Sequence, residues 1–172
     1  YFGILLELID SIKSHPQSSS YDIAIMNVGM TEEQTRTIKD LGAKVFTTEW
    51  PCEISPHKIK GREYLKACVC RPFINKYLSG YETYIWLDTD TWVQDWKSIE
   101  LFEQGAQKGS MACTLLLGRI YKAGERIKWL GPFQWKARGF YYSNAKRAFS
   151  KKLARKLFHQ HTVSAGAFAL RA

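Results

Sequence analysis

The chain has 172 residues, of which 45% are hydrophobic and 14% aromatic, and its net charge is +9. This length suits a single domain, and so much apolar surface excludes an intrinsically disordered chain. No apolar run reaches the roughly 18 residues that a membrane span requires, and no signal peptide is recognisable. Because the chain begins at Tyr1 rather than Met and ends inside an expected strand, we expect residues 1–172 to be a single domain, as a fragment of a longer protein.

Hydrophobic periodicity and turn residues predict helices that alternate with short strands. In chain order, the expected elements are a helix at 1–12, a strand at 22–28, a helix at 31–41, a strand at 44–48, a helix at 63–78, a strand at 83–87, a helix at 97–106, a strand at 111–117, a helix at 144–158 and a strand at 163–170. Thr31 and Gln34 form a capping box for the second helix. Residues 118–143 are expected to leave the sheet as an irregular excursion. Short connections between alternating elements favour an α/β fold with a Rossmann-like, mainly parallel sheet covered by helices on both faces.

The positive charge is concentrated in one segment. Residues 119–161 contain 12 Lys or Arg and a single acid, Glu125, which leaves 13 basic and 15 acidic residues in the rest of the chain. The charge therefore belongs to a surface or a site, and its partners are expected to be anionic phosphates, acidic lipid headgroups or nucleic acid. We treat residues 119–161 as a basic, aromatic excursion within the domain.

The cysteines carry no metal-binding pattern, because Cys68 and Cys70 are two residues apart and no second pair matches them. We interpret them, with Cys52 and Cys113, as reduced thiols, which favours a cytoplasmic location.

The triplet Asp88-Thr89-Asp90 directly follows the most apolar strand, TYIWL. Ligands of parallel α/β sheets bind beyond the carboxyl ends of the strands, so these acids stand where a site is expected. Two carboxylates in this place suit Mg²⁺ or Mn²⁺ carrying a diphosphate. The competing interpretation is that the acids only end the strand and cap the next helix.

Residues 84–92, Tyr-Ile-Trp-Leu-Asp-Thr-Asp-Thr-Trp, resemble the DxD segment of metal-dependent glycosyltransferases with the GT-A fold, and residues 71–93 resemble their galactosyltransferase and glycogenin-like members. The resemblance implies a hexosyltransferase that moves a sugar from a nucleoside diphosphate, expected to be uridine diphosphate (UDP), to a hydroxyl of a glycan, lipid or protein acceptor. It also implies manganese or magnesium bound by Asp88 and Asp90, with Asp90 as the main ligand.

The same resemblance implies the other donor-binding residues. Arg71 stands 17 residues before Asp88, where relatives have an Arg that reaches the donor, and Thr89 lies within the triplet. Residues 163–168 resemble a later Asn-x-Gly-Val strand that lies against the donor sugar, which adds Ser164 and Gly166. Ser164 departs from the family's Asn. The first strand would precede Tyr1, with Tyr1 and Phe2 as its remnant, and the His that completes the metal site in many relatives would follow Ala172.

No catalytic base is assigned. Asp95 and Glu125 are candidates, although Asp95 is better explained as a cap for the helix that follows it. His159 and His161 are better explained as cations near a helix C-terminus than as metal ligands.

Two other functions stay open. Asp88-Thr89-Asp90-Thr91 also fits the D-x-D-x-T signature of haloacid dehalogenase-like phosphatases, but that family places the motif on its first strand and needs a later acidic pair, which is not found here. The second alternative is a non-catalytic, basic domain that binds nucleotide sugars or nucleic acid. No nucleic-acid-binding signature is present, so nucleic acid is not an expected partner.

The basic excursion offers two partner surfaces. In the helix at 144–158, Phe149, Leu153 and Leu157 form a stripe between basic residues, which either packs on the domain or contacts an anionic membrane peripherally. Six aromatic residues form either an acceptor platform or core: Trp129, Phe133, Trp135, Phe140, Tyr141 and Tyr142.

Overall fold

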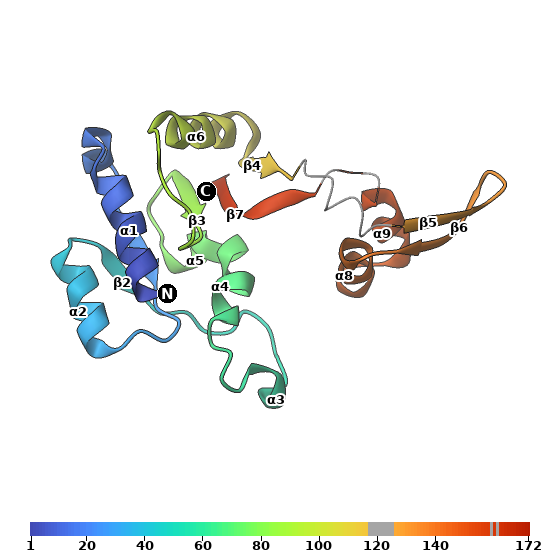
Figure 1. Cartoon of the computed structure of the whole chain (residues 1–172), viewed down its shortest axis with the longest axis horizontal. Helices are drawn as coiled ribbons and strands as arrows, with labels where there is room; N and C mark the ends of the chain where they lie inside the picture. Colours follow the sequence, from blue (N-terminus) through green and yellow to red (C-terminus); the bar gives the residue numbers. More distant parts are fainter. Residues whose placement is uncertain (117–125, 159, 161) are drawn as a thin grey trace. The chain divides into compact units, whose positions relative to one another are not determined.

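The structure, a computed structural model, describes residues 1–116, 126–158, 160 and 162–172. These residues form two compact units, Tyr1–Ala112 with Gly166–Ala172 and Cys113–Ala165, which are described separately below. Helices and strands both contribute, so the predicted mixed α/β character is confirmed (Figure 1). Within the described ranges, no helix is long and apolar enough to cross a membrane.

The first unit contains most of the elements. They are α1 (Phe2–Lys13), η1 (Pro16–Ser20), β1 (Ala24–Met26), α2 (Glu32–Asp40), β2 (Lys44–Phe46), α3 (Pro56–Ile59), α4 (Leu65–Cys70), η2 (Arg71–Phe73), α5 (Ile74–Tyr77), β3 (Thr83–Leu87) and α6 (Lys97–Gly109). Strands β4 (Met111–Leu115) and β7 (Val163–Arg171) cross the boundary between the units.

The sheets are small. Strand β1 pairs with β2 in parallel, whereas β3 pairs with β7 in antiparallel register, with Leu87 opposite Ala167 and Thr83 opposite Arg171. Strand β7 lies between β3 and β4. A large, mainly parallel Rossmann-like sheet is therefore not seen among the residues that the structure describes. The expectation of a mainly parallel sheet did not anticipate this antiparallel pair, because a buried apolar strand has the same residue pattern in either direction.

Helix α1 links the two apolar clusters of the first unit. Its Leu5 and Ile9 pack with Ile38 of α2 against β1 and β2. Further along, Ile12 packs against the second cluster, which is centred on Val93, Trp96 and Ile99 and also receives Ile85 and Leu87 of β3. The helix therefore fixes the position of the chain that leaves β3.

Helix α2 confirms the predicted capping box, because the Thr31 hydroxyl accepts the Gln34 N–H at 3.2 Å and the Gln34 side chain accepts the Thr31 N–H at 3.0 Å. The single helix predicted at 63–78 was wrong. It is divided into α4, η2 and α5 at Pro72, which has no N–H for the helical ladder and whose ring disfavours the preceding helical turn.

The second unit contains β5 (Arg126–Leu130), β6 (Phe133–Arg138), α8 (Phe140–Ala148) and α9 (Lys151–Leu157). The irregular excursion predicted at 118–143 is thus partly an antiparallel hairpin, β5–β6. The helix predicted at 144–158 is divided in two because Ser150 begins a new helix, where its hydroxyl accepts the Leu153 N–H at 3.1 Å. Residues 117–125 lie outside the described residues.

Candidate functional site

Strand β3 and the turn after it place the two aspartates differently. The Asp88 N–H donates to the Gly166 carbonyl at 2.7 Å, which extends the β3–β7 pairing by one residue. The Asp88 carbonyl then accepts the Thr91 N–H at 3.0 Å and the Thr91 hydroxyl at 2.7 Å, which closes a tight turn. Asp88 is consequently held at the end of the paired strand, whereas Thr89 and Asp90 are exposed in the turn.

The Asp88 carboxylate is held by one polar group and one cationic group. The Trp86 indole Nε1–H donates to Oδ1 at 2.7 Å, and the Arg71 Nη1 lies 3.3 Å from each carboxylate oxygen. Trp86 and Asp88 are two residues apart, so they share one face of the extended chain. The side chains of Arg71 and Asp88 are 11% and 31% exposed, so the pair is shielded enough for its charges to interact more strongly than at an open surface.

Arg71 itself is fixed by its surroundings. Its Nε–H donates to the Ala67 carbonyl at 3.1 Å, and its Cζ lies 5.2 Å from the centroid of the Trp86 ring. Trp86 in turn stacks on Phe168 of β7, with 6.4 Å between ring centroids and an interplanar angle of 11°. A guanidinium between a carboxylate and an indole ring is a rigid cation. The break at Pro72, directly after Arg71, leaves this residue at the end of α4.

Asp90 differs from Asp88 in its contacts. Among the described residues, the Asp90 side chain is exposed and makes no hydrogen bond or ion pair. Its oxygens are therefore open to a cation from solution. The described part of the chain contains no group of three His, Cys, Asp or Glu side chains suited to holding a metal ion. Any metal bound by Asp90 would thus take further oxygen ligands from water and a bound phosphate, as Mg²⁺ commonly does.

A cavity of about 580 Å³ opens beside the triplet. Asp88, Thr89 and Asp90 line it together with the carboxyl end of β1 and the beginning of α1, where Tyr1 and Phe2 contribute. Other lining residues are largely apolar and include Leu5, Met26, Val28, Met30, Phe46, Ile85 and Leu87. This volume and this mixture of apolar walls with a few polar groups are typical of small-molecule sites.

The loop after β1 forms part of the cavity wall and has its own support. The Asn27 Oδ1 accepts the N–H groups of Gly29 and Met30 at 2.9 and 2.8 Å. Gly29 has φ +136°, a conformation that side-chain-bearing residues rarely adopt. A second cavity of about 530 Å³ shares Ala24, Ile74 and Ile85 with the first, so open space extends along the facing edges of β1 and β3.

Two polar residues of α1 and its following loop hold the chain just beyond the triplet. The Val93 N–H donates to the buried Ser11 hydroxyl at 3.2 Å, and that hydroxyl donates to the Leu8 carbonyl at 2.7 Å. The Val93 carbonyl lies 3.1 Å from the His15 Nε2. Sequence reasoning missed Ser11, whose only signal was a polar residue on the apolar face of α1. It also missed Trp86, which the two-residue strand period places beside Asp88.

The remaining predicted residues are distributed as follows. Gly166 lies at the triplet, through its hydrogen bond to Asp88. Ser164 lies on β7, two residues before Gly166, and is assigned to the Cys113–Ala165 unit. Asp95 accepts the Lys97 N–H at 2.8 Å at the beginning of α6, as a cap does. Glu125, His159 and His161 lie outside the described residues.

Comparison of the chain with protein-family models, with curated proteins and with solved structures gives no match. The features that bear on function are therefore the chemistry of the triplet, the Arg71 guanidinium beside it and the adjoining cavity.

Proposed function

We propose that the chain is a metal-dependent glycosyltransferase domain of GT-A type, which binds a nucleoside diphosphate sugar beside Asp88-Thr89-Asp90. The observation that carries the proposal is the division of the triplet between Asp88, held by Arg71 and Trp86, and an exposed Asp90 at the edge of a cavity. A fixed carboxylate beside an accessible carboxylate suits a site that binds its metal ion together with the substrate.

The chemistry follows from charge. When a sugar is transferred, the diphosphate leaves with additional negative charge, and a divalent cation stabilises that charge. Mn²⁺ or Mg²⁺ is the cation that the hard carboxylate oxygens of the triplet favour. In this proposal Asp90 binds the cation directly. Asp88 keeps unused lone pairs, so it supports the cation directly or through water, and Arg71 fixes the orientation of Asp88.

The cavity supplies the remaining donor contacts. Its apolar wall from the carboxyl end of β1 to the beginning of α1 offers a surface for a flat base, while the triplet lies at the polar part of the lining. The backbone N–H groups at the beginning of α1 add partial positive charge, which favours a phosphate. UDP is the expected nucleotide, and the acceptor is a hydroxyl of a glycan, lipid or protein.

The phosphatase alternative makes different demands on Asp88. As a nucleophile, that carboxylate would have to attack phosphorus directly, whereas it can support a cation through water, and both of its oxygens already contact Arg71 while one contacts Trp86. The exposed acid is Asp90, which that mechanism uses for proton transfer. These contacts favour the transferase over the phosphatase.

Calorimetric titration of the chain with UDP, with and without Mn²⁺, tests the proposal. We expect binding of UDP that requires Mn²⁺ and that is lost in Asp90→Ala. Asp88→Asn should weaken metal-dependent binding less than Asp90→Ala does, because Asp88 also has a positioning role. Asp40→Ala, which removes an exposed carboxylate at the end of α2, is the matched control and should bind as the unaltered chain does.

Turnover separates the alternatives. Release of UDP from UDP-glucose or UDP-galactose, lost in Asp90→Ala, would support transferase activity. Hydrolysis of p-nitrophenyl phosphate with Mg²⁺, lost in Asp88→Asn, would establish the phosphatase instead. Metal-dependent UDP binding without turnover on any nucleotide sugar would indicate the non-catalytic binding domain, and an absence of metal-dependent binding would refute the site altogether.

A further inference from the structure

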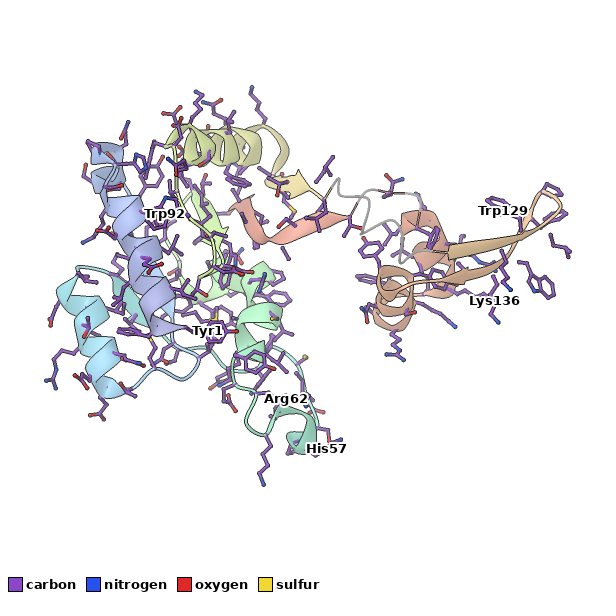
Figure 2. All side chains as sticks on the ribbon, viewed as in Figure 1. Tyr1, His57, Arg62, Trp92, Trp129 and Lys136 are labelled. Atoms are coloured by element: carbon purple, nitrogen blue, oxygen red, sulfur yellow. The ribbon has the colours of Figure 1, made fainter. Side chains whose placement is uncertain are left out.

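The β5–β6 hairpin carries a cluster of exposed apolar side chains around its turn, which we call the hairpin tip. Its members are Trp129 (57% exposed), Leu130 (61%), Phe133 (73%) and Trp135 (69%), on either side of Gly131-Pro132. Figure 1 shows the turn directed away from α8 and α9, and Figure 2 shows Trp129 and Lys136 projecting from the hairpin. Large apolar side chains gathered in one exposed place indicate a binding surface more strongly than the same residues scattered singly.

The hairpin tip is distinct from the core of its own unit. That core is formed by Tyr142, Ala145 and Ala154, with Ala137 of β6 packed against it. Tyr142 is 7% exposed and meets Phe158 edge to face, so it belongs to the core and not to an aromatic platform. The hairpin is consequently anchored by the strand end near Ala137, whereas its opposite end presents Trp129 and its neighbours outward.

Two exposed lysines flank the hairpin tip, and their placement favours an anionic partner. Lys128 and Lys136 are directly opposite each other in the antiparallel register, and both are exposed. Like charges at paired positions destabilise a hairpin. The unit Cys113–Ala165 has 12 basic residues and one acid in its sequence. It therefore has too few carboxylates to offset the repulsion between the two lysines. An anionic surface would relieve it.

We propose that the hairpin tip docks on an anionic lipid bilayer, with Trp129, Leu130 and Phe133 in the interfacial region and the lysines among the headgroups. Trp is favoured at that depth because its ring is apolar and its indole N–H still finds polar partners. Lysine stems lie along apolar material while their ammonium groups reach phosphates and carboxylates. Single-stranded nucleic acid fits less well, because bases would stack on the three aromatic rings but gain nothing from Leu130 and Pro132 at the protruding turn, whereas a bilayer accommodates all of these side chains.

The proposed contact does not depend on the triplet, and it adds to the membrane contact expected at the helix predicted at 144–158, where Phe149 is 68% exposed. Vesicle co-sedimentation of the whole chain tests it, with phosphatidylcholine vesicles and with vesicles containing about 30% phosphatidylserine. We expect binding at least about tenfold stronger to the anionic vesicles, weakening as salt rises.

Two double variants separate the contributions of the rings and the charges. Trp129→Ala with Phe133→Ala should weaken binding to the anionic vesicles about tenfold, because interfacial burial of both rings is lost. Lys128→Glu with Lys136→Glu should weaken it about tenfold or more, since each headgroup attraction becomes a repulsion. Far-ultraviolet circular dichroism confirms that the variants remain folded.

Matched controls lie in the first unit. Trp92→Ala removes a tryptophan that is 56% exposed, and Lys39→Glu with Lys108→Glu reverses the charge at two exposed lysines. Both controls should bind the anionic vesicles within about threefold of the unaltered chain, because they leave the hairpin tip intact. Equal losses in the controls and the hairpin variants would overturn the proposal, since exposed rings and positive charge anywhere on the chain would then explain binding.

Other occupants give other results. If a single-stranded oligonucleotide binds more tightly than the vesicles and the hairpin variants remove only that binding, the surface is for nucleic acid and the membrane proposal fails. If the unaltered chain is a dimer that the Trp129→Ala, Phe133→Ala variant converts to a monomer without changing vesicle binding, the tip is covered by a second copy, and the proposal fails equally.

Discussion

Replacing Ser11 by Ala tests how the chain beyond the triplet is held. In the structure the Ser11 hydroxyl is the acceptor for the Val93 N–H, at 3.2 Å, and both residues are buried. Alanine removes that acceptor and leaves little space for water to replace it. The neighbouring Leu8 carbonyl loses the hydroxyl as a second donor, but it retains its place in the helical hydrogen-bond ladder.

The expected cost can be worked from these contacts. A buried backbone N–H left without a partner costs about 1–3 kcal/mol. Alanine is the better helix former, which offsets the loss by about 0.5 kcal/mol. The net destabilisation should therefore be about 0.5–2.5 kcal/mol. The control is Ser19→Ala, because Ser19 is exposed and its hydroxyl donates only to the Pro16 carbonyl at 2.9 Å.

Two measurements check this value. Urea unfolding gives the loss of stability in Ser11→Ala, and hydrogen exchange gives the protection of the Val93 amide itself. The exchange measurement is the more specific, because a chain of two compact units need not unfold in one step. If Ser11→Ala matches Ser19→Ala in urea and the Val93 amide stays equally protected, Ser11 does not hold this segment, and the account of how α1 positions the triplet is wrong.

Three further outcomes are expected from the first unit. Gly105→Ala should destabilise by about 1–3 kcal/mol, measured by urea unfolding, because its new Cβ would lie 2.7 Å from the Ala112 Cβ. Gly109→Ala, in the same helix but with nothing within 4 Å of the added Cβ, should stabilise by up to about 1 kcal/mol, and a loss of stability there would contradict this. Burial, reinforced by the Glu103 carboxylate, raises the pKa of Tyr21 to about 12. The pKa of Tyr21 is higher in the folded chain than in the unfolded chain, so its contribution to stability is complete below pH 10 and is lost as pH rises to about 12. Tyr21→Phe should therefore flatten the fall in the free energy of unfolding over that pH range.

Local chemistry determined which elements could be predicted from sequence. The capping box at Thr31 and the apolar run of β3 depend on only a few neighbouring residues, so the helix and the strand predicted from them agree with the structure. Pro72 and Ser150 are equally local signals, yet the longer apolar periodicity around each obscured them, and two helices were predicted as continuous. A proline or a capping serine within a periodic stretch deserves as much weight as the periodicity itself.

Pairing between distant segments could not be predicted in this way. The antiparallel β7 has residues that suit either direction, and its partner β3 is 80 residues earlier at the level of Leu87 and Ala167. Residues 118–143 were expected to be irregular, although Gly131, with φ +55°, lies in the turn that connects β5 and β6. Among the side chains near Asp88, Arg71 was named from a resemblance, and Trp86 could have been named from the two-residue period of the strand. The contact of Ser11 with Val93 joins segments 82 residues apart, and no local pattern predicts it.

The unequal surroundings of the two aspartates follow from where the sheet ends. Asp88 donates the last β3–β7 hydrogen bond, so its side chain takes the direction of Trp86, two residues earlier, and meets Arg71. One residue later the strand has become a turn closed by Thr91, and Asp90 no longer has a neighbouring strand to supply partners. A chain ending its pairing one residue later would bring Thr89 into the sheet and alter both roles. The residue at which the β3–β7 pairing ends, more than the spacing of the two acids, therefore determines which carboxylate is fixed and which is open to a cation.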